Sequence, residues 1–330
     1  SVTVICSDKT GTLTRNEMTV QRVVCAGHVF DVGGVGYAPV GDCSIDGRTI
    51  DVARYPALAM AVRDGVLCND ARLNEDTGVW SVVGDPTEGA LLVLGGKTGF
   101  TQEQGAQAWP RRDSIPFESQ HRFMATLHQD GDGDAWIFAK GAPERILDMC
   151  GSQLAHDGEK PLDVDHWRRM ATDTAAQGLR LLALACKRAD AGKAQLDMAD
   201  MEHGFMLLAL VGIIDPPREE AMQAVRECHH AGIRVKMITG DHAETARAIG
   251  AQLGIGAGKP AITGAELALM DDAALRSVAM EVDVFARASP EHKLRLVQAL
   301  QENQQVVAMT GDGVNDALAL ECANVGVAMG

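Results

Sequence analysis

The sequence "VTVICSDKTGTLT" (residues 2–14) holds the pattern from which the architecture of this chain follows. Its first half is a short, continuous apolar run, which is typical of a strand buried on both faces of a parallel sheet. The run ends on Asp8, followed at once by a lysine, two threonines and a glycine. A solubilising turn accepts almost any polar mixture, whereas a phosphate site needs a placed carboxylate, hydroxyl groups and a cation. The rest of the chain distinguishes these two interpretations of Asp8.

Two later segments repeat the pattern of an apolar run that ends in glycine and aspartate. They are "IRVKMITGD" (233–241) and "QVVAMTGDG" (305–313), and a helical pattern follows each of them. Alternating strands and helices predict a doubly wound parallel α/β sheet, with ligands at the carboxyl ends of the strands. The three strand ends are therefore expected to converge on one site. Asp241 stands three residues before Glu244, which also predicts a capping box at the next helix.

The middle of the chain has a different character. All four tryptophans and both tyrosines fall between residues 37 and 167, and "RFMATLHQDGDGDAWIFAKG" (122–141) predicts a hairpin of two strands. We expect an inserted α+β domain, built on an antiparallel sheet, over residues 23–212, with residues 1–22 and 213–330 forming the split α/β domain. The stretch "IIDPPREEA" marks the return, where Asp215 is predicted to cap a helix that begins with two prolines.

Composition limits the function classes. With 46% apolar residues the chain can bury sizeable cores, and its net charge of 30 − 45 = −15 argues against a nucleic-acid binder, which needs clustered lysine and arginine. The eight cysteines form no CxxC pair, which predicts buried thiols in a reducing compartment. The longest apolar stretch, residues 205–214, falls short of the ~20 residues of a membrane helix. We therefore expect this chain by itself to be soluble.

The strand ends favour phosphate chemistry over plain turns. Asp312, in a loop that would cradle a phosphate, implies a divalent cation between the two negative groups, and Mg²⁺ commonly takes one or two carboxylates with phosphate oxygens. Asp8 beside such a cation becomes a plausible carboxylate nucleophile. The hydroxyl of Thr239 and the unhindered amide of Gly240 suit a phosphate oxygen. Lys293, in the first turn of an amphipathic helix, is either a surface lysine or a fixed countercharge for a transferring phosphoryl group.

Five motifs together resemble one family. "SDKTGTLT", "KGAPE", "DPPR", "TGD" and "TGDGVNDA" occur here in the order seen in P-type ATPases, and the match covers essentially the whole chain. The chain is similar to the cytosolic phosphorylation and nucleotide-binding domains of a type II cation pump of the Ca²⁺-pump kind. This resemblance implies a haloacid dehalogenase-like fold for the split domain and an aspartyl-phosphate mechanism that uses ATP and Mg²⁺.

The resemblance also implies residue roles. The catalytic residues it assigns are Asp8 as the phosphorylated aspartate, with Lys293, Thr239, Gly240 and Asp241. The Mg²⁺ ligands it assigns are Asp8, Thr10 through its carbonyl, Asp312 and, in support, Asp316. The nucleotide residues it assigns are Glu88, Phe117, Arg122, Lys140, Gly141 and Arg180, with Thr10 and Asn315 near the phosphates. An aromatic face for adenine and cations for the triphosphate make physical sense of this set.

Alternatives remain open at several of these positions. Phe117 can equally be a core residue, and Asp85, Pro86 and Glu88 also form a good helix start. Arg122 stands where many relatives carry lysine, and a planar guanidinium is not a point charge. A soluble phosphatase of the same fold is the rival function. Such phosphatases usually carry a second aspartate two residues after the nucleophile, where this chain has Thr10, and a nucleotide-binding module without catalysis is a third hypothesis.

The resemblance places the chain in a larger molecule. No membrane segment, actuator loop or cation-site helix is visible, so we expect a fragment of an integral membrane pump at the cytoplasmic face of a membrane. Its partners would be ATP, the transmembrane and actuator domains of the same polypeptide, and a transported cation bound outside these residues. Ca²⁺ is the expected cation, with Na⁺, K⁺ and H⁺ as alternatives.

Overall fold

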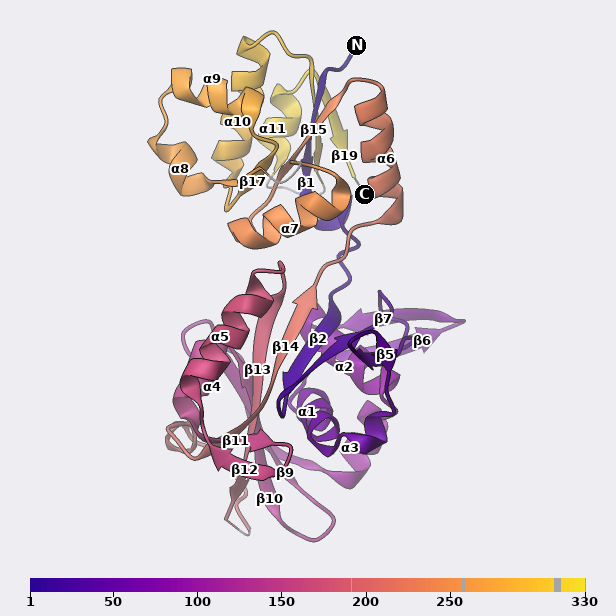
Figure 1. The fold of residues 1–330 in the computed structure, drawn as a ribbon, viewed down its shortest axis with the longest axis vertical. Coiled ribbons are helices and arrows are strands. Elements are labelled where there is room, and N and C mark those ends of the chain that lie inside the picture. The colour runs from indigo at the N-terminus through magenta and orange to yellow at the C-terminus, as the bar shows by residue number, and fades with distance from the viewer. Residues whose placement is uncertain (191, 257–258, 312–315, 330) are drawn as a thin grey trace. The chain divides into compact units, whose positions relative to one another are not determined.

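The computed structural model describes residues 1–190, 192–256, 259–311 and 316–329, and it divides into two compact units (Figure 1). Unit 1 comprises Ser1–Asn16, Ala176–Gly178 and Asp215–Gly330, and unit 2 comprises Glu17–Ala175 and Leu179–Ile214. The first division falls before the expected boundary at residue 22, because β2 (Thr19–Cys25) pairs with β14 (Phe205–Ile214) inside the sheet of unit 2. Strand pairing, not sequence composition, sets this boundary.

Unit 1 is built on a parallel sheet, as the short apolar runs predicted. Within the described residues its strand order is β16-β17-β15-β1-β18-β19. The strands are β1 (Val4–Asp8), β15 (Arg234–Ile238), β16 (Ile262–Thr263), β17 (Val284–Ala286), β18 (Val307–Gly311) and β19 (Val325–Ala328). β1 lies between β15 and β18, with Asp8 paired to Ile238 and Ser7 paired to Thr310. The three segments that end in polar residues are therefore neighbours in the sheet.

Helices lie on both sides of this sheet (Figure 1). They are α6 (Glu219–His230), α7 (Ala243–Leu253), α8 (Gly264–Leu269), α9 (Asp272–Glu281), α10 (Pro290–Glu302) and α11 (Ala317–Cys322). Alternate residues of β1, Val4 and Cys6, are buried against the helices α8 to α11 in one core, where Leu296 and Leu300 are fully buried. On the other face, Met237 of β15 packs near α7. Burial on both faces explains why β1 and β18 are mostly apolar.

Unit 2 is built on an antiparallel sheet. Within the described residues its main path is β5-β4-β3-β2-β14-β13-β10-β9-β8, with β11 and β12 added beside β14 and a separate β6-β7 hairpin. The strands not yet given are β3 (His28–Val32), β4 (Cys43–Ile45), β5 (Arg48–Thr49), β6 (Arg72–Asp76), β7 (Val79–Val83), β8 (Arg111–Ile115), β9 (Phe123–Gln129), β10 (Ala135–Gly141), β11 (Cys150–Ala155), β12 (Gly158–Pro161) and β13 (Arg180–Ala189). The predicted hairpin over residues 122–141 is confirmed as β9 and β10.

Helices cover both faces of the sheet of unit 2 (Figure 1). They are α1 (Pro56–Leu67), α2 (Pro86–Lys97), α3 (Gln102–Ala108), α4 (Pro143–Met149) and α5 (Val164–Ala175), with short turns η2 (Val52–Arg54) and η3 (Met198–Met201). One core lies between the sheet and α1, α2 and α3, around Leu58, Leu91 and Phe138. The other lies beneath α4 and α5, around Trp167 and Phe205. The helix start at Asp85 is confirmed, because its carboxylate accepts from the first-turn amides of α2.

Two of the passages between the units, after Asn16 and before Asp215, lie at neighbouring points of the chain's path. In unit 1, Thr14 forms a bridge with Pro217, and the Arg15 amide donates to the Pro216 carbonyl at 3.0 Å. In unit 2, Thr19 at the start of β2 pairs with Ile214 at the end of β14. In the described ranges no helix has both the length and the apolar character that crossing a membrane requires.

Candidate functional site

Asp8 lies at the carboxyl end of β1 and is only 8% exposed. Lys293 reaches it from the first turn of α10, a helix that begins with Pro290 and is capped by the Ser289 side chain. The Lys293 Nζ donates to Asp8 Oδ1 at 2.5 Å and to Asp316 Oδ1 at 2.6 Å. Lys293 is 6% exposed and Asp316 is 2% exposed. The interpretation of Lys293 as a surface lysine is therefore wrong.

The charge of Lys293 is stabilised by these two carboxylates. Burial alone would lower the pKa of the ammonium, but the hydrogen bonds and charges of Asp316 and Asp8 outweigh burial and raise it above its usual value. One buried cation between two buried carboxylates leaves this cluster, Asp8, Lys293 and Asp316, with a formal charge of −1. An approaching phosphate would need further positive charge at the same place.

A second ion-pair group stands beside the first. Lys9, directly after Asp8, is 4% exposed, and its Nζ lies 2.8 Å from Asp241 Oδ2 and 3.6 Å from Asp215 Oδ2. The predicted capping role of Asp241 is wrong, because α7 has His242 at its N-cap position, with no side-chain capping bond. The carboxylate of Asp241 binds Lys9 instead. Sequence reasoning missed Lys9, although a lysine that follows a strand-ending acid was a usable signal.

Asp215 also differs from the prediction. It accepts from the Thr14 hydroxyl at 2.5 Å and from the Asn16 amide at 2.8 Å, and it does not cap α6, whose N-cap residue is Arg218. Arg218 in turn donates to the carbonyls of Thr14 and Gly11, each at 2.9 Å. These bonds fix the turn η1 (Lys9–Leu13), in which Gly11 has a φ of +73° that favours glycine. The motif "DPPR" therefore holds the loop behind Asp8.

Thr239 and Gly240 follow Ile238, the strand residue paired with Asp8. Thr239 is 2% exposed, and its Oγ1 accepts from the Asp241 amide at 3.1 Å. A Cβ placed on Gly240 would meet no atom within 4 Å, so its backbone borders open space. The hydroxyl and this open backbone lie at the same strand ends as Asp8.

Two of the oxygen donors predicted for Mg²⁺ belong to residues only two positions apart in the described part of the chain, Asp8 and Thr10. Asp8 supplies a carboxylate and Thr10 a backbone carbonyl from η1, and hard oxygen donors are what Mg²⁺ prefers. Asp312 and Asn315 lie outside the described residues. The carboxylate of Asp316 binds Lys293, and no group of three or more metal-ligating side chains occurs among the described residues.

Thr12 adds an observation that sequence reasoning did not anticipate. Its Oγ1 is buried in η1, within the same turn as Thr10, and has no hydrogen-bond partner among the described residues. Buried hydroxyls usually find a partner, and an unpartnered one calls for an ion, a water or a ligand. The oxygen donors of this turn therefore fit a hydrated cation with its phosphate.

In unit 2 the structure brings together Glu88 of α2 and Lys140 of β10. The Lys140 Nζ lies 2.7 Å from Glu88 Oε1 and also donates to the Cys68 carbonyl and, at 3.3 Å, to Met124 Sδ. Lys140 is 6% exposed. The second oxygen of Glu88 accepts from the amides of Asp70 at 3.1 Å and Ala71 at 3.0 Å. This pair is thus part of the interior, and the helix-start interpretation of Glu88 does not exclude its role here.

A buried acid accompanies this pair. Asp64 lies on α1 four residues before Cys68, whose amide donates to the Asp64 carbonyl at 2.8 Å. The Asp64 carboxyl is fully buried, and neither of its oxygens has a hydrogen-bond partner among the described residues. Burial raises the pKa of Asp64 well above 3.8, although the charge of Lys140 opposes part of that shift.

Three of the other predicted nucleotide residues lie at the surface, and the fourth, Gly141, is buried. Phe117 is 59% exposed, so its interpretation as a core residue is wrong, and Arg180 at the start of β13 is exposed. Arg122 has a φ of +60°, and its Nη1 lies 2.6 Å from Glu144 Oε1. A Cβ on Gly141 would lie 2.4 Å from the Arg122 carbonyl oxygen, so packing against this neighbour alone requires glycine.

Comparison with known proteins adds the remaining evidence. Residues 57–220 match the family described as "P-type ATPase, cytoplasmic domain N". The chain is 49% identical to the cation-transporting ATPase pma1 of Synechocystis sp., over 100% of this chain and 37% of that protein. It is 41% identical to a calcium-transporting ATPase of Bacillus subtilis, over 99% and 37%. It is 40% identical to the human calcium-transporting ATPase type 2C member 1, over 99% and 34%. The chain thus spans little more than a third of these relatives.

Proposed function

Because the chain belongs to the P-type ATPases, we propose that it is the catalytic cytosolic part of an ATP-driven cation pump. In this proposal ATP binds unit 2, and its γ-phosphoryl group is transferred to Asp8. The observation that carries the proposal is the buried cluster at the end of β1, where Lys293 joins Asp8 to Asp316 at 2.5 and 2.6 Å. A turn residue would have no need of a buried cation shared with a second acid.

The chemical step follows from the cluster. A carboxylate oxygen of Asp8 forms a bond to the γ-phosphorus of ATP, the bond from that phosphorus to the bridging oxygen breaks, and ADP leaves with the electron pair. Lys293 holds the carboxylate in place and supplies positive charge as negative charge accumulates on the phosphoryl oxygens. Asp316 keeps the lysine charged and oriented. The hydroxyl of Thr239 and the open backbone at Gly240 would receive phosphoryl oxygens.

We assign Mg²⁺ to Asp8, the Thr10 carbonyl and Asp312. When bound, the cation would neutralise phosphate charge, which the cluster of Asp8, Lys293 and Asp316 cannot do with its formal charge of −1. Because Asp316 is bound to Lys293, we now assign it to the lysine. Asn315 stays a predicted neighbour of the phosphates.

Unit 2 would bind the nucleotide at the edge formed by β9, β10 and α2. Phe117 offers an exposed aromatic face for adenine, and Arg122 and Arg180 offer exposed cations for phosphates. Lys140 and Glu88 lie deeper, where they organise the backbone at Asp70 and Cys68. Their role in this proposal is to hold the pocket and to meet the part of the nucleotide that enters furthest.

The remaining elements of the proposal concern the whole protein. The parallel sheet with helices on both sides supports a haloacid dehalogenase-like fold for unit 1. The names of the relatives support transport of a cation, and two of the three name calcium, so Ca²⁺ is the proposed cation. The pump would be an integral membrane protein with this part at its cytoplasmic face, coupled to transmembrane and actuator domains of the same polypeptide.

Covalent labelling tests the proposal directly. The chain, and a longer protein that contains it, would be mixed with ATP labelled at the γ-phosphate and quenched in acid. We expect label on the protein that hydroxylamine removes, and no label on Asp8→Asn, which should still bind ATP. Persistent labelling of Asp8→Asn would contradict the assignment. Rapid turnover of small phosphate esters without any labelling by ATP would favour the soluble phosphatase.

A further inference from the structure

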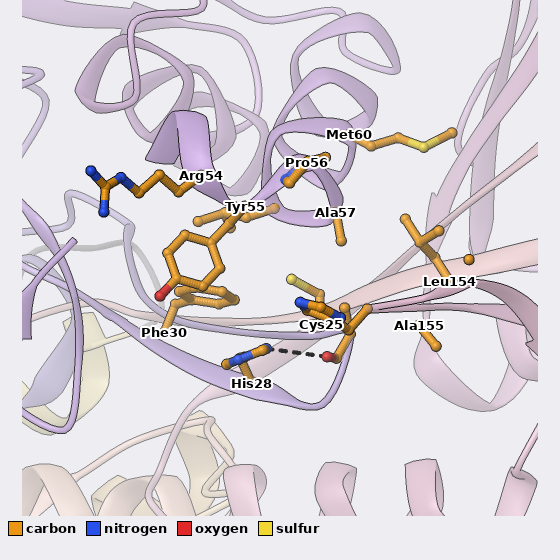
Figure 2. A pocket seen from close by; sticks show the side chains of 14 residues that line it. Cys25, His28, Phe30, Arg54, Tyr55, Pro56, Ala57, Met60, Leu154 and Ala155 are labelled. Carbon is orange, nitrogen blue, oxygen red and sulfur yellow. Dashed lines mark hydrogen bonds between the residues drawn. The ribbon is translucent and has the colours of Figure 1, made fainter. Parts of the chain in front are cut away.

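The helix α1 connects two different places in unit 2. Its start lines a cavity of about 680 Å³, in which Tyr55 lies on one side and Leu154 on the other (Figure 2). The residues assigned above to ATP are not among the lining residues of this cavity. The helix has 12 residues, so its other end lies about 17 Å away along the axis. There the Cys68 carbonyl accepts from Lys140, so it is the end of α1 that meets the proposed nucleotide site.

Arg111, in β8, binds segment 67–71, which comprises the last residue of α1 and the four residues that follow it. The Arg111 Nη2 donates to the Leu67 carbonyl at 3.0 Å and to the Asn69 carbonyl at 2.5 Å, and its Nη1 donates to Asp70 Oδ1 at 2.6 Å. The last carbonyl groups of a helix have no partner within it, and a cation at this end is also favoured by the helix dipole. Because a guanidinium presents its donors in a rigid fork, these three bonds fix segment 67–71 relative to β8.

The same segment holds Glu88. The amides of Asp70 and Ala71 donate to Glu88 Oε2 at 3.1 and 3.0 Å, while the Lys140 Nζ lies 2.7 Å from Glu88 Oε1. Asn69, which is 3% exposed, donates to the Glu88 carbonyl at 2.9 Å and accepts from the Ala71 amide at 3.0 Å. A carboxylate held by two amides on one oxygen and an ammonium on the other follows its partners. A shift of segment 67–71 would therefore change the positions of Glu88 and Lys140.

Arg111 also belongs to the strand that leads to the proposed adenine residue. β8 ends at Ile115, and Phe117 follows two residues later. Within the sheet, Arg111 pairs with His128 of β9. The Arg111 side chain thus joins the strand before Phe117 to the segment that holds Glu88 and Lys140, which are the shallow and the deep parts of the proposed ATP site.

We infer that Arg111 is a positioning residue for ATP binding in unit 2, an inference that rests on the nucleotide site proposed above. Arg111 acts without touching the nucleotide: it holds segment 67–71, whose amides hold Glu88, and Glu88 holds Lys140. Without Arg111, segment 67–71 loses three charge-assisted hydrogen bonds. ATP then binds more weakly, although Phe117 and Lys140 are unchanged.

The first test compares Arg111→Gln with Arg112→Gln by calorimetry of ATP binding to the 330-residue chain. Arg112 is the next residue of β8, and its Nη2 donates to Gln129 Oε1. Each variant removes one positive charge from the same strand, so any general attraction of the surface for ATP is lost about equally. We expect Arg111→Gln to bind ATP at least about tenfold more weakly than the parent chain, and Arg112→Gln to stay within about twofold of it. Similar affinities for the two variants would overturn the inference.

The second test asks whether Arg111 acts through Glu88. Glu88→Gln keeps the size of the side chain but removes the charge that joins segment 67–71 to Lys140. In the Glu88→Gln background, Arg111→Gln should weaken ATP binding by less than about threefold, because the connection is already broken. A general loosening of the fold would weaken binding by the same factor in both backgrounds. A loss of about tenfold in the Glu88→Gln background would therefore overturn the inference.

A milder substitution keeps the inference testable if Arg111→Gln proves unstable, which thermal unfolding read by tryptophan fluorescence would show. Arg111→Lys keeps a charged donor but not the fork, so it should bind ATP more strongly than Arg111→Gln and at least about threefold more weakly than Arg112→Lys. Equal affinities for the two lysine variants would overturn the inference. Failure of the parent chain to bind ATP would refute the proposed nucleotide site together with this inference, whereas parent-like binding by Arg111→Gln would refute the inference alone.

Discussion

Replacing Lys293 by methionine should destabilise unit 1 strongly, and more than the loss of the buried Lys236 does. The substitution keeps the apolar stem but leaves Asp8 and Asp316 buried together, at 8% and 2% exposure, without the cation between them. Removing one partner of a buried pair costs about 3–5 kcal/mol. Since one lysine here serves two carboxylates, we expect Lys293→Met to cost about 5 kcal/mol at pH 7.

The cost should depend on pH in a defined direction. In the parent chain the raised pKa of Lys293 keeps it charged in both states below pH 10, so its contribution is constant between pH 5 and 8. In Lys293→Met the two acids repel, and one of them keeps a proton in the folded state that it loses on unfolding. The folded state then binds more protons, so stability falls as pH rises. The deficit should therefore be smaller at pH 5 than at pH 8.

Unit 1 contains no tryptophan, because all four lie between residues 80 and 167. Hydrogen exchange of β1 and β18 peptides, read by mass spectrometry in urea, reports the opening of unit 1, and tryptophan fluorescence reports unit 2 as an internal control. Lys236→Met is the matched variant. Lys236 is also buried, and its Nζ lies 2.8 Å from Asp283. In Lys236→Met, Asp283 keeps Arg234 as a partner at 2.7 Å, so the loss of stability should be clearly smaller than in Lys293→Met.

Two results would refute this reasoning. One is a loss for Lys293→Met that is no larger than the loss for Lys236→Met. The other is a deficit that does not change between pH 5 and 8. Adding Asp316→Asn to Lys293→Met should recover part of the stability, because it removes one of the two repelling charges.

Three further changes test unit 2. Burial lowers the pKa of His128 from 6.5 to about 4, so between these pH values only the unfolded chain gains the His128 proton. The free energy of unfolding, measured in urea, should therefore fall by about 3 kcal/mol as pH drops from 6.5 to 4. His128→Gln should remove most of this pH dependence. The pH dependence of stability that Asp64 causes has the opposite sign, because its raised pKa makes stability fall as pH rises above 3.8. Asp64→Asn should flatten that fall in the same urea series. Phe117→Ala should weaken ATP binding by about 1–3 kcal/mol in calorimetry while changing stability by less than about 0.5 kcal/mol. Lys140→Met should weaken ATP binding and also lower stability, because it removes the cation from the half-buried Glu88 carboxylate. Equal stability losses for the two variants would contradict the assigned roles.

The sheet of unit 1 and the meeting of its strand ends could be predicted because they depend on local rules. A continuous apolar run indicates a strand covered on both faces, and parallel strands present their carboxyl ends at one edge. The confirmed neighbours β15, β1 and β18 required nothing more. The hairpin of β9 and β10 was predictable for the same reason, since its turn residues stand between two strand-like runs.

The side-chain partners at these strand ends were not predictable in the same way. Asp241 and Asp215 both stand where a helix cap is reasonable, and nearby sequence gives no sign that Lys9 competes for them. Their choice depends on a turn that the sequence places more than 200 residues away. Lys293 posed the same difficulty, because an amphipathic helix shows which face is apolar but not whether its first turn covers a strand end.

The passages after Asn16 and before Asp215 have an architectural consequence. Thr14 and Pro217 are bridged in unit 1, and Thr19 and Ile214 are paired in unit 2. In each unit, the two chain ends that lead to the other unit therefore lie side by side. The entropy cost of closing a loop between such ends grows only slowly with the length of the chain between them. Unit 2 therefore has the geometry of an exchangeable cassette. A two- or three-residue linker could replace it, or a differently sized domain could take its place, while the sheet that carries Asp8 keeps its connectivity.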